Sequence, residues 1–233
     1  MLIYSALGEL TERHARKGWW PAETPFEVCA GAILTQNTNW KNAATAVAKL
    51  KEAGLLSPAC IIETEQGKLE ELIRSAGFYR QKAERLKALS LFIQDELSGD
   101  ITHLRDYPLD EAREKLLAIK GIGNETADTI LLYACHIPSF VVDSYTIRWL
   151  NRMGVGKERY GDVKGLFEQI LPRDAEKYAI AHAAIVEFSK NICSSTPRCE
   201  ICTLKDRCHH YLRERKQRSR RPAQARGQQS GEQ

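Results

Sequence analysis

Long hydrophobic runs are missing from this sequence of 233 residues. No uninterrupted apolar segment reaches the roughly 18 residues that a membrane-spanning helix needs, so we expect no membrane partner. The amino-terminal residues 1–5 lack both the basic region and the long apolar core of a secretory signal peptide. These absences argue against a membrane protein and a secreted protein, and they predict a cytoplasmic location.

Patterns typical of β-strands are almost absent, because apolar and polar residues rarely alternate over several positions. Apolar residues recur instead at every third or fourth position, as Leu86, Leu89 and Ile93 do. The sequence therefore predicts an all-α fold, and it shows no internal repeat. Helices are expected over residues 2–16, 25–37, 40–53, 66–75, 79–98, 108–118, 124–135, 144–152, 162–171 and 174–192.

An excess of charge of one sign is absent from most of the chain. Hydrophobic residues make up 43% and charged residues 27%, as in an ordinary soluble protein, and the formal net charge is +4. Residues 213–233 hold seven Lys or Arg against two Glu, a net +5 that leaves −1 for the remainder. We therefore expect 213–233 to be a basic disordered tail, which either adds salt-sensitive affinity for DNA or only solvates the chain. Phosphate contacts of the folded body must then be local.

A pair of glycines marks the most informative segment of the chain. Gly121 and Gly123 lie one residue apart between two apolar runs, which is typical of a tight turn between helices. The second helix begins at this turn, so its free N–H groups and its positive dipole end are placed to bind a phosphate. An ordinary helical hairpin is the alternative. If the turn binds DNA, the contacts fall on Gly121, Gly123, Asn124 and Thr126.

Four of the seven cysteines fall within residues 193–208, with the spacing Cys193-x5-Cys199-x2-Cys202-x5-Cys208. Stacked disulfides are not expected in a cytoplasmic protein, so the cluster predicts metal ligation. Zinc sites usually combine two Cys-x2-Cys pairs, whereas two longer and equal spacers suit a [4Fe–4S] cluster better. The spacing alone does not exclude zinc as the metal that these cysteines bind. Arg198 in this loop either contacts a phosphate or offsets the negative charge of a cluster.

The glycine hairpin, the segment Val141-Val142-Asp143 and the terminal cysteines resemble, in this order, the helix-hairpin-helix DNA glycosylases of the endonuclease III superfamily. The resemblance covers about residues 19–208 and implies a [4Fe–4S] cluster, because relatives with this cysteine spacing carry one. It also implies two helical lobes. One is a six-helix barrel of residues 22–136 with the hairpin at about 112–134. The other combines 1–21 with 137–212 and the cluster loop 193–208, and double-stranded DNA with a damaged base lies across the cleft.

The chain departs from the family pattern at one position. Bifunctional relatives carry a lysine two residues after the second glycine of the hairpin, and this sequence has Glu125 there. A carboxylate cannot form a Schiff base, so we expect a monofunctional glycosylase without lyase activity. Lys120 precedes the glycines and is expected to point elsewhere. Asp143 is expected to stabilise the oxocarbenium-like sugar or to activate water, and the alternative is a helix cap, for which Ser144 is the better candidate.

Three of the four tryptophans lie close together, with Trp19-Trp20-Pro21 before one predicted helix and Trp40 after it. Such residues are often plain core. The pattern nevertheless resembles the 3-methyladenine DNA glycosylase branch of the superfamily, in which the matching aromatic residues sandwich the extruded base. A 3-methylated purine nucleotide is cationic, so it gains from cation–π stacking that a normal base lacks. The resemblance thus implies an alkylated purine as the substrate.

Two further residues match positions of the superfamily. Gln36 matches the residue that fills the gap left in the duplex, and Lys190 matches a pocket lysine of the alkylpurine branch; a surface residue is the alternative for each. Better-matching members of that branch can lack the cysteines, so three other functions stay open. These are a uracil or thymine mismatch glycosylase, an endonuclease III-type glycosylase with lyase activity, and a non-catalytic DNA-binding module. We expect a nucleoid-associated monomer whose abasic product passes to an AP endonuclease.

Overall fold

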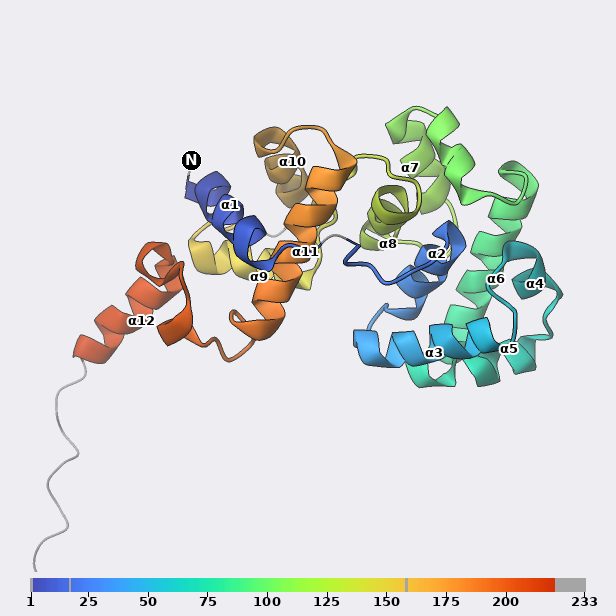
Figure 1. The fold of residues 1–233 in the computed structure, drawn as a ribbon, viewed down its shortest axis with the longest axis horizontal. Helices are drawn as coiled ribbons and strands as arrows, with labels where there is room; N and C mark the ends of the chain where they lie inside the picture. The colour runs from blue at the N-terminus through green and yellow to red at the C-terminus, as the bar shows by residue number, and fades with distance from the viewer. Residues whose placement is uncertain (1, 17, 158, 221–233) are drawn as a thin grey trace, which may run out of the picture.

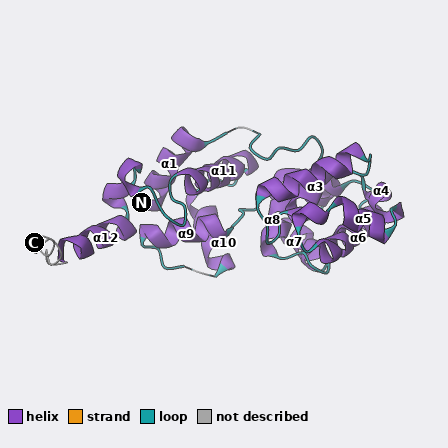
Figure 2. Cartoon of the chain, turned by 90° about the horizontal axis from the view of Figure 1, so that it is seen from below, coloured by secondary structure: helices purple, strands orange, loops and turns teal. Residues whose placement is uncertain are grey.

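The computed structural model of the chain describes residues 2–16, 18–157 and 159–220, with side chains to 217. The described residues form α-helices with short 3-10 and π-helical segments and contain no strand, so the prediction of an all-α fold is confirmed (Figures 1 and 2). None of the described helices is long and apolar enough to cross a membrane. The helices form two groups, and each group has its own hydrophobic core.

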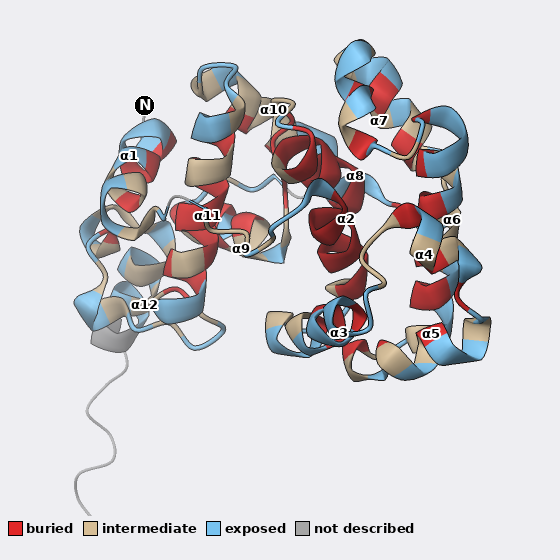
Figure 3. Ribbon diagram, turned by 45° about the vertical axis from the view of Figure 1, so that its right-hand side comes forward, coloured by how far each residue is buried: buried red, intermediate tan, exposed pale blue. Residues whose placement is uncertain are grey.

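The first core is built around α2, which is apolar over nearly its whole circumference. Nine of its ten residues are buried, as expected for a helix enclosed by others (Figure 3). Residues 22–136 form seven α-helices rather than six, because the Ser57-Pro58 start signal produces the additional short helix α4. The elements are α2 (Pro25–Leu34), α3 (Trp40–Glu52), α4 (Pro58–Glu63), α5 (Gln66–Leu72), η1 (Arg74–Ala76), α6 (Tyr79–Glu96), η2 (Ile101–Asp106), α7 (Leu109–Leu117), α8 (Asn124–Thr129) and the π-helical segment η3 (Ile130–Ala134).

The second core joins the amino-terminal helix to the last third of the described chain. Helix α1 packs along α11, as Figure 1 shows, although the two are far apart in sequence. Phe140 stacks on Phe167 with 4.2 Å between ring centroids, which anchors the segment that precedes Asp143. The elements are α1 (Leu2–His14), α9 (Ser144–Met153), α10 (Tyr160–Ile170), α11 (Ala175–Asn191), η4 (Cys199–Ile201), η5 (Lys205–Arg207) and α12 (His209–Arg220).

A buried carboxylate connects the two groups of helices. Asp128 of α8 has no exposed surface and accepts hydrogen bonds from the guanidinium of Arg113 at 2.9 and 3.0 Å. It also accepts from the hydroxyls of Ser139 and, at 2.7 Å, of Tyr160 on α10. Buried charges are stable only when they are paired in this way. The network fixes the start of the segment that leads to Asp143.

Helix α12 corrects the prediction for the carboxyl-terminal tail. Residues 213–220 are helical rather than disordered, and the helix packs against α9 and η5. Arg, Lys, Gln and Glu are good helix formers, and neither glycine nor proline interrupts the run before Pro222. The rest of the predicted tail, residues 221–233, lies outside the described residues.

Candidate active site and cysteine loop

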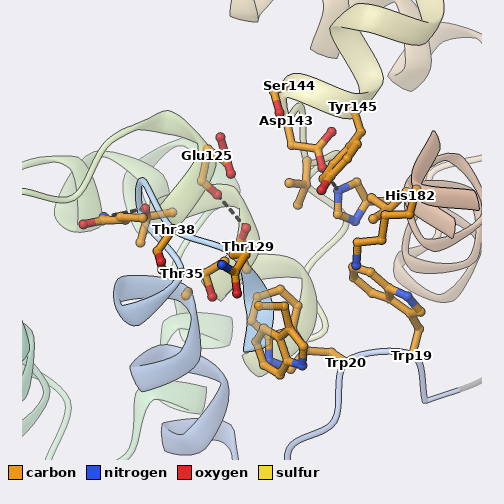
Figure 4. A pocket seen from close by; sticks show the side chains of 18 of the residues that line it. Trp19, Trp20, Thr35, Thr38, Glu125, Thr129, Asp143, Ser144, Tyr145 and His182 are labelled. Atoms are coloured by element: carbon orange, nitrogen blue, oxygen red, sulfur yellow. Dashed lines mark hydrogen bonds and ion pairs between the residues drawn. The ribbon is translucent and has the colours of Figure 1, made fainter. Parts of the chain in front are cut away.

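A cavity of about 970 Å³ lies where the two groups of helices meet (Figure 4). From the first group it is lined by α2, the loop 35–39, α3, α6 and α8. From the second group it is lined by α9 and α11, and from the connecting segment by residues 18–21. The hairpin residues Gly121, Gly123 and Asn124 and the cysteine loop do not line it. Of the residues predicted for the site, the cavity brings together Trp19, Trp20, Pro21, Gln36, Trp40, Glu125, Thr126, Asp143 and Lys190.

Asp143 both caps a helix and faces the cavity. Its Oδ1 accepts from the backbone N–H of Thr146 at 2.7 Å and from the Thr146 hydroxyl at 2.8 Å, so Asp143 rather than Ser144 is the N-cap of α9. Burial raises the pKa of the Asp143 carboxyl, but His182 and the bonds from Thr146 outweigh it and hold that pKa below its usual range. The side chain is therefore an ionised carboxylate at neutral pH.

His182 lies beside Asp143, and Tyr133 lies beside His182; neither residue is predicted as a site residue from the sequence. The Nε2 atom of His182 lies 3.5 Å from Asp143 Oδ2, and its Nδ1 atom lies 2.7 Å from the Tyr133 hydroxyl. Figure 4 shows the imidazole and the carboxylate pointing toward one another. The available signal was a lone histidine in the apolar run Ala181–Ile185, which is equally typical of a core residue.

Glu125 faces the same cavity from the first turn of α8. Desolvation, followed by the negative charge of Asp143, raises the pKa of the Glu125 carboxyl to about 7. Lys120 is exposed and does not line the cavity. The position of the family lysine thus holds an acid that titrates near neutrality.

Trp20 and Trp40 pack against the first core and also line the cavity, whereas Trp19 lines the cavity from the connecting segment. A sandwich of these rings around an extruded base stays a prediction. The rings of Trp20 and Trp40 meet edge to face at 5.5 Å, and Trp19 meets Trp20 at 6.1 Å. The Trp19 Nε1–H donates to Glu187 at 3.0 Å, which fixes the ring. Lys190 lines the cavity with its Nζ 5.5 Å from the centre of the Trp19 ring.

The hairpin turn depends on the first glycine more than on the second. Gly121 has φ +89°, and a Cβ there would lie 2.5 Å from the side chain of Arg85. Gly123 has φ −99° and open space around it, and it is the N-cap of α8. Only Gly121 therefore requires glycine for its conformation and for the close approach of a neighbour.

Gln36 ties the end of α2 to the hairpin. Its Nε2 donates to Gly121 O at 3.2 Å and to the Thr126 hydroxyl at 2.9 Å, while Arg85 donates to its Oε1. Thr126 is buried with its hydroxyl occupied, whereas Asn124 is exposed and accepts from Arg113. Insertion of Gln36 into DNA stays a prediction, and it requires these bonds to open.

The four clustered cysteines line one small pocket beneath α9 and α12, together with Arg152 and Lys205. The Nη1 of Arg152 donates to Cys193 O at 2.9 Å and lies 3.2 Å from its Sγ. Arg198 also lines this pocket, and it donates to Asn191 O at the end of α11. The described residues contain no group of three or more His, Cys, Asp or Glu side chains arranged to hold a single metal ion. Four thiols around one pocket beside an arginine are a donor set that fits an anionic [4Fe–4S] cluster.

Known sequences that are similar to this chain are DNA repair proteins. The HhH-GPD superfamily of base excision DNA repair proteins matches residues 30–173. A Methanocaldococcus jannaschii protein, provisionally named a DNA repair glycosylase, is 44% identical over 211 residues, which cover 89% of this chain and 96% of that protein. Endonuclease III of Thermotoga maritima is 31% identical over 191 residues, covering 81% and 84% of the two chains.

Solved structures show the same relationship. The Helicobacter pylori 3-methyladenine DNA glycosylase, bound to 1,N6-ethenoadenine, is 35% identical with a TM-score of 0.69, covering 81% of this chain and 95% of that one. A non-covalent endonuclease III–DNA complex has a TM-score of 0.79 and covers 92% and 97% of the chains at 24% identity. The second match establishes the fold alone.

Proposed function

Because the chain belongs to the HhH-GPD superfamily of base excision DNA repair proteins, we propose that it is a monofunctional DNA glycosylase that removes an alkylated purine such as 3-methyladenine. The observation that carries the proposal is the cavity between the lobes. An ionised Asp143 lines this cavity together with Trp19, Trp20 and Trp40. Double-stranded DNA lies across the cleft, and the damaged nucleotide is turned out of the stack into this cavity.

The reaction that this geometry supports is hydrolysis at C1′ of the flipped nucleotide. The bond between C1′ and the base breaks and its electron pair leaves with the base, so positive charge develops on the sugar. The carboxylate of Asp143 stabilises that charge, and it then takes a proton from the water whose oxygen bonds to C1′. The products are the free base and an intact strand with an abasic site, the substrate of an AP endonuclease.

The lining of the cavity supports a cationic base as the substrate. Trp19, Trp20 and Trp40 offer aromatic faces, and a ring that carries a formal positive charge gains cation–π attraction on them. The carboxylate of Asp143 adds a favourable negative potential, to which Glu125 contributes above its pKa of about 7. The 35% identical H. pylori structure is a 3-methyladenine glycosylase, which agrees with this choice.

Cys193, Cys199, Cys202 and Cys208 are proposed to hold a [4Fe–4S] cluster. When bound, the cluster organises a loop, 194–207, that has few apolar residues of its own. Purified protein should then contain about four iron atoms per chain and absorb visible light. Colourless protein with one zinc would contradict this assignment.

One excision panel tests the proposed reaction. Duplexes that contain 3-methyladenine, 7-methylguanine, uracil or a thymine–guanine mismatch are incubated with the protein, and released base is measured. We expect release of the alkylated purines only. Release of uracil or thymine alone would replace the substrate class with the mismatch class. No release from any duplex, with DNA binding retained, would favour a non-catalytic binding module.

A glycosylase with lyase activity is the second candidate, and the position of Lys190 is the observation that favours it. This lysine lines the cavity even though the hairpin position holds Glu125. Borohydride added during turnover traps a Schiff base as a covalent protein–DNA adduct. We expect no adduct. An adduct that disappears in Lys190→Gln would make Lys190 the nucleophile and overturn the monofunctional assignment.

A further inference from the structure

His182 is a buried polar side chain at the floor of the cavity, and only one of its two nitrogens is hydrogen-bonded. The residue is 3% exposed. Its Nδ1 lies 2.7 Å from the Tyr133 hydroxyl, while its Nε2 has no hydrogen-bond partner among the described residues and lies 3.5 Å from Asp143 Oδ2. A buried ring nitrogen without a partner costs free energy, so it indicates a role at the site.

The surroundings favour one tautomer of the neutral ring. A lone pair on Nε2 would face a carboxylate, whereas an Nε2–H is attracted to it. The Tyr133 hydroxyl completes this arrangement by donating its proton to Nδ1. The same hydroxyl lies 3.4 Å from Ala179 O, which is its alternative acceptor. In this tautomer the Nε2–H of the ring is directed at Asp143 Oδ2.

The contact between His182 Nε2 and Asp143 Oδ2 holds the second oxygen of the Asp143 carboxylate in place. Thr146 binds Oδ1 of Asp143 with two hydrogen bonds. These bonds fix the position of Oδ1 but leave Oδ2 free to shift by small rotations of the carboxylate. An Nε2–H next to Oδ2 restricts that rotation and leaves the remaining lone pairs of Oδ2 for the sugar or the water. Several other titratable groups lie around this pair: Tyr133 of η3, Glu187 and Lys190 of α11, and Glu125 of α8. The charge of Glu125 opposes that of Asp143.

We propose that His182 is a positioning residue for Asp143: its Nε2–H orients Oδ2 for the reaction, and the Tyr133 hydroxyl fixes the tautomer that carries this proton. The inference rests on the proposed glycosylase function for its kinetic consequences, but the tautomer itself can be measured without substrate. A hydrogen-bond partner of this kind fixes the orientation of an imidazole ring and the nitrogen that carries its proton.

The first experiment measures the tautomer in the full-length protein. Long-range ¹H–¹⁵N spectra distinguish the two ring nitrogens of each of the six histidines, and His182→Gln identifies the signal of His182. We expect the proton on Nε2 in the wild type and a mixture of tautomers in Tyr133→Phe. A ring protonated only on Nδ1 would overturn the proposal, whether or not the protein proves to be a glycosylase.

The second experiment measures single-turnover excision of 3-methyladenine against pH. His182→Leu should lower the rate by about 10- to 100-fold and move its acid limb to higher pH, because Asp143 loses the partner that favours its charged form. His182→Gln, which keeps a neutral donor, should recover part of the rate, and the affinity for DNA should change less than about threefold. The comparison is made in a Glu125→Gln background, which removes the titration of Glu125.

The outcomes separate the two hypotheses. An unmoved acid limb in a folded His182→Leu protein, with equal rates for the Leu and Gln variants, would overturn the positioning role while leaving the glycosylase intact. A wild type that releases no base would refute the proposed function, and the tautomer measurement would still decide the arrangement of His182. If His182→Leu does not fold, Tyr133→Phe and His182→Gln provide the same comparison.

Discussion

Two carboxyl groups face the same cavity, and their surroundings move their pKa values in opposite directions. Asp143 is held below its usual range by His182 and Thr146, while desolvation and the charge of Asp143 raise the pKa of Glu125 to about 7. Pairs of acids that are separated in this way are typical of sites at which the two groups have different tasks. Asp143 carries the permanent charge, and Glu125 adjusts the potential of the cavity with pH.

Replacement of Asp143 by asparagine tests the catalytic assignment. Asparagine is also a good N-cap, so α9 should keep its start and the protein its fold. The single-turnover rate on 3-methyladenine DNA should fall by about 10²- to 10⁴-fold, because the charge opposite C1′ is lost. Affinity for DNA, measured by fluorescence anisotropy, should persist. An unchanged excision rate would remove Asp143 from the mechanism.

Glu125 predicts a dependence of stability on pH. Its pKa of about 7 in the folded protein exceeds the value of about 4.3 expected for an unfolded chain, so the folded state retains the proton longer. Stability is therefore lost as pH rises from about 4.3 to about 7. The Glu125 side chain is exposed to solvent in the open cavity, so screening by water keeps this loss small. Glu125→Gln should raise the melting temperature at pH 8 and change it little at pH 4. An equal shift at both values would contradict the raised pKa.

Among the secondary-structure elements, the hairpin between α7 and α8 offers a matched pair of substitutions. Gly121→Ala combines a positive φ with a Cβ only 2.5 Å from Arg85, so it should lower the free energy of unfolding by about 1–3 kcal/mol. Gly123→Ala adds a methyl group to open space at an ordinary φ and should cost clearly less. Urea denaturation measures both. Equal losses would show that the turn does not depend on the conformation of Gly121.

Apolar periodicity and start and stop residues predict most helices correctly. The predicted helix ends are wrong where contacts with distant segments decide where a helix stops. The stretch expected as 25–37 ends at Leu34, because Thr35 closes the helix and the chain turns toward the hairpin. The stretch expected as 124–135 divides into α8 and the π-helical segment η3, where the chain passes from the first core to the second. Such boundaries depend on the partners of a helix rather than on its own residues.

For the molecule as a whole, the network around Asp128 sets the relation between the hairpin and the segment that carries Asp143. It joins α7 and α8 of the first group to α10 and Ser139 of the second. The carboxylate is wholly buried, and it is 3.6 Å from the ammonium group of Lys164 as well. Loss of this one group should therefore loosen the contact between the lobes.

Asp128→Ala should lower the free energy of unfolding by about 3–5 kcal/mol, because it removes the only carboxylate partner of Arg113 among the described residues and the acceptor of the Ser139 and Tyr160 hydroxyls. Asp128→Asn should cost less. The exposed pair of Glu96 and Lys115 is the control, and Glu96→Gln should have little effect. Chemical denaturation measures all three, and a neutral Asp128→Ala would show that the lobes are held together by apolar contacts alone.

Features that depend only on neighbours along the chain can be predicted from the sequence. Helical periodicity, the glycine turn and the spacing of the cysteines are local, and so is the acid that replaces the family lysine at position 125. The folded structure alone brings His182 beside Asp143, hydrogen-bonds Tyr133 to His182 and binds Gln36 to the hairpin. These contacts join the loop after α2 to α8, and the N-cap of α9 to α11 and the π-helical segment η3. Hydrophobic packing of the two cores brings these segments together. The apolar periodicity of one segment does not show which distant segment will pack against it.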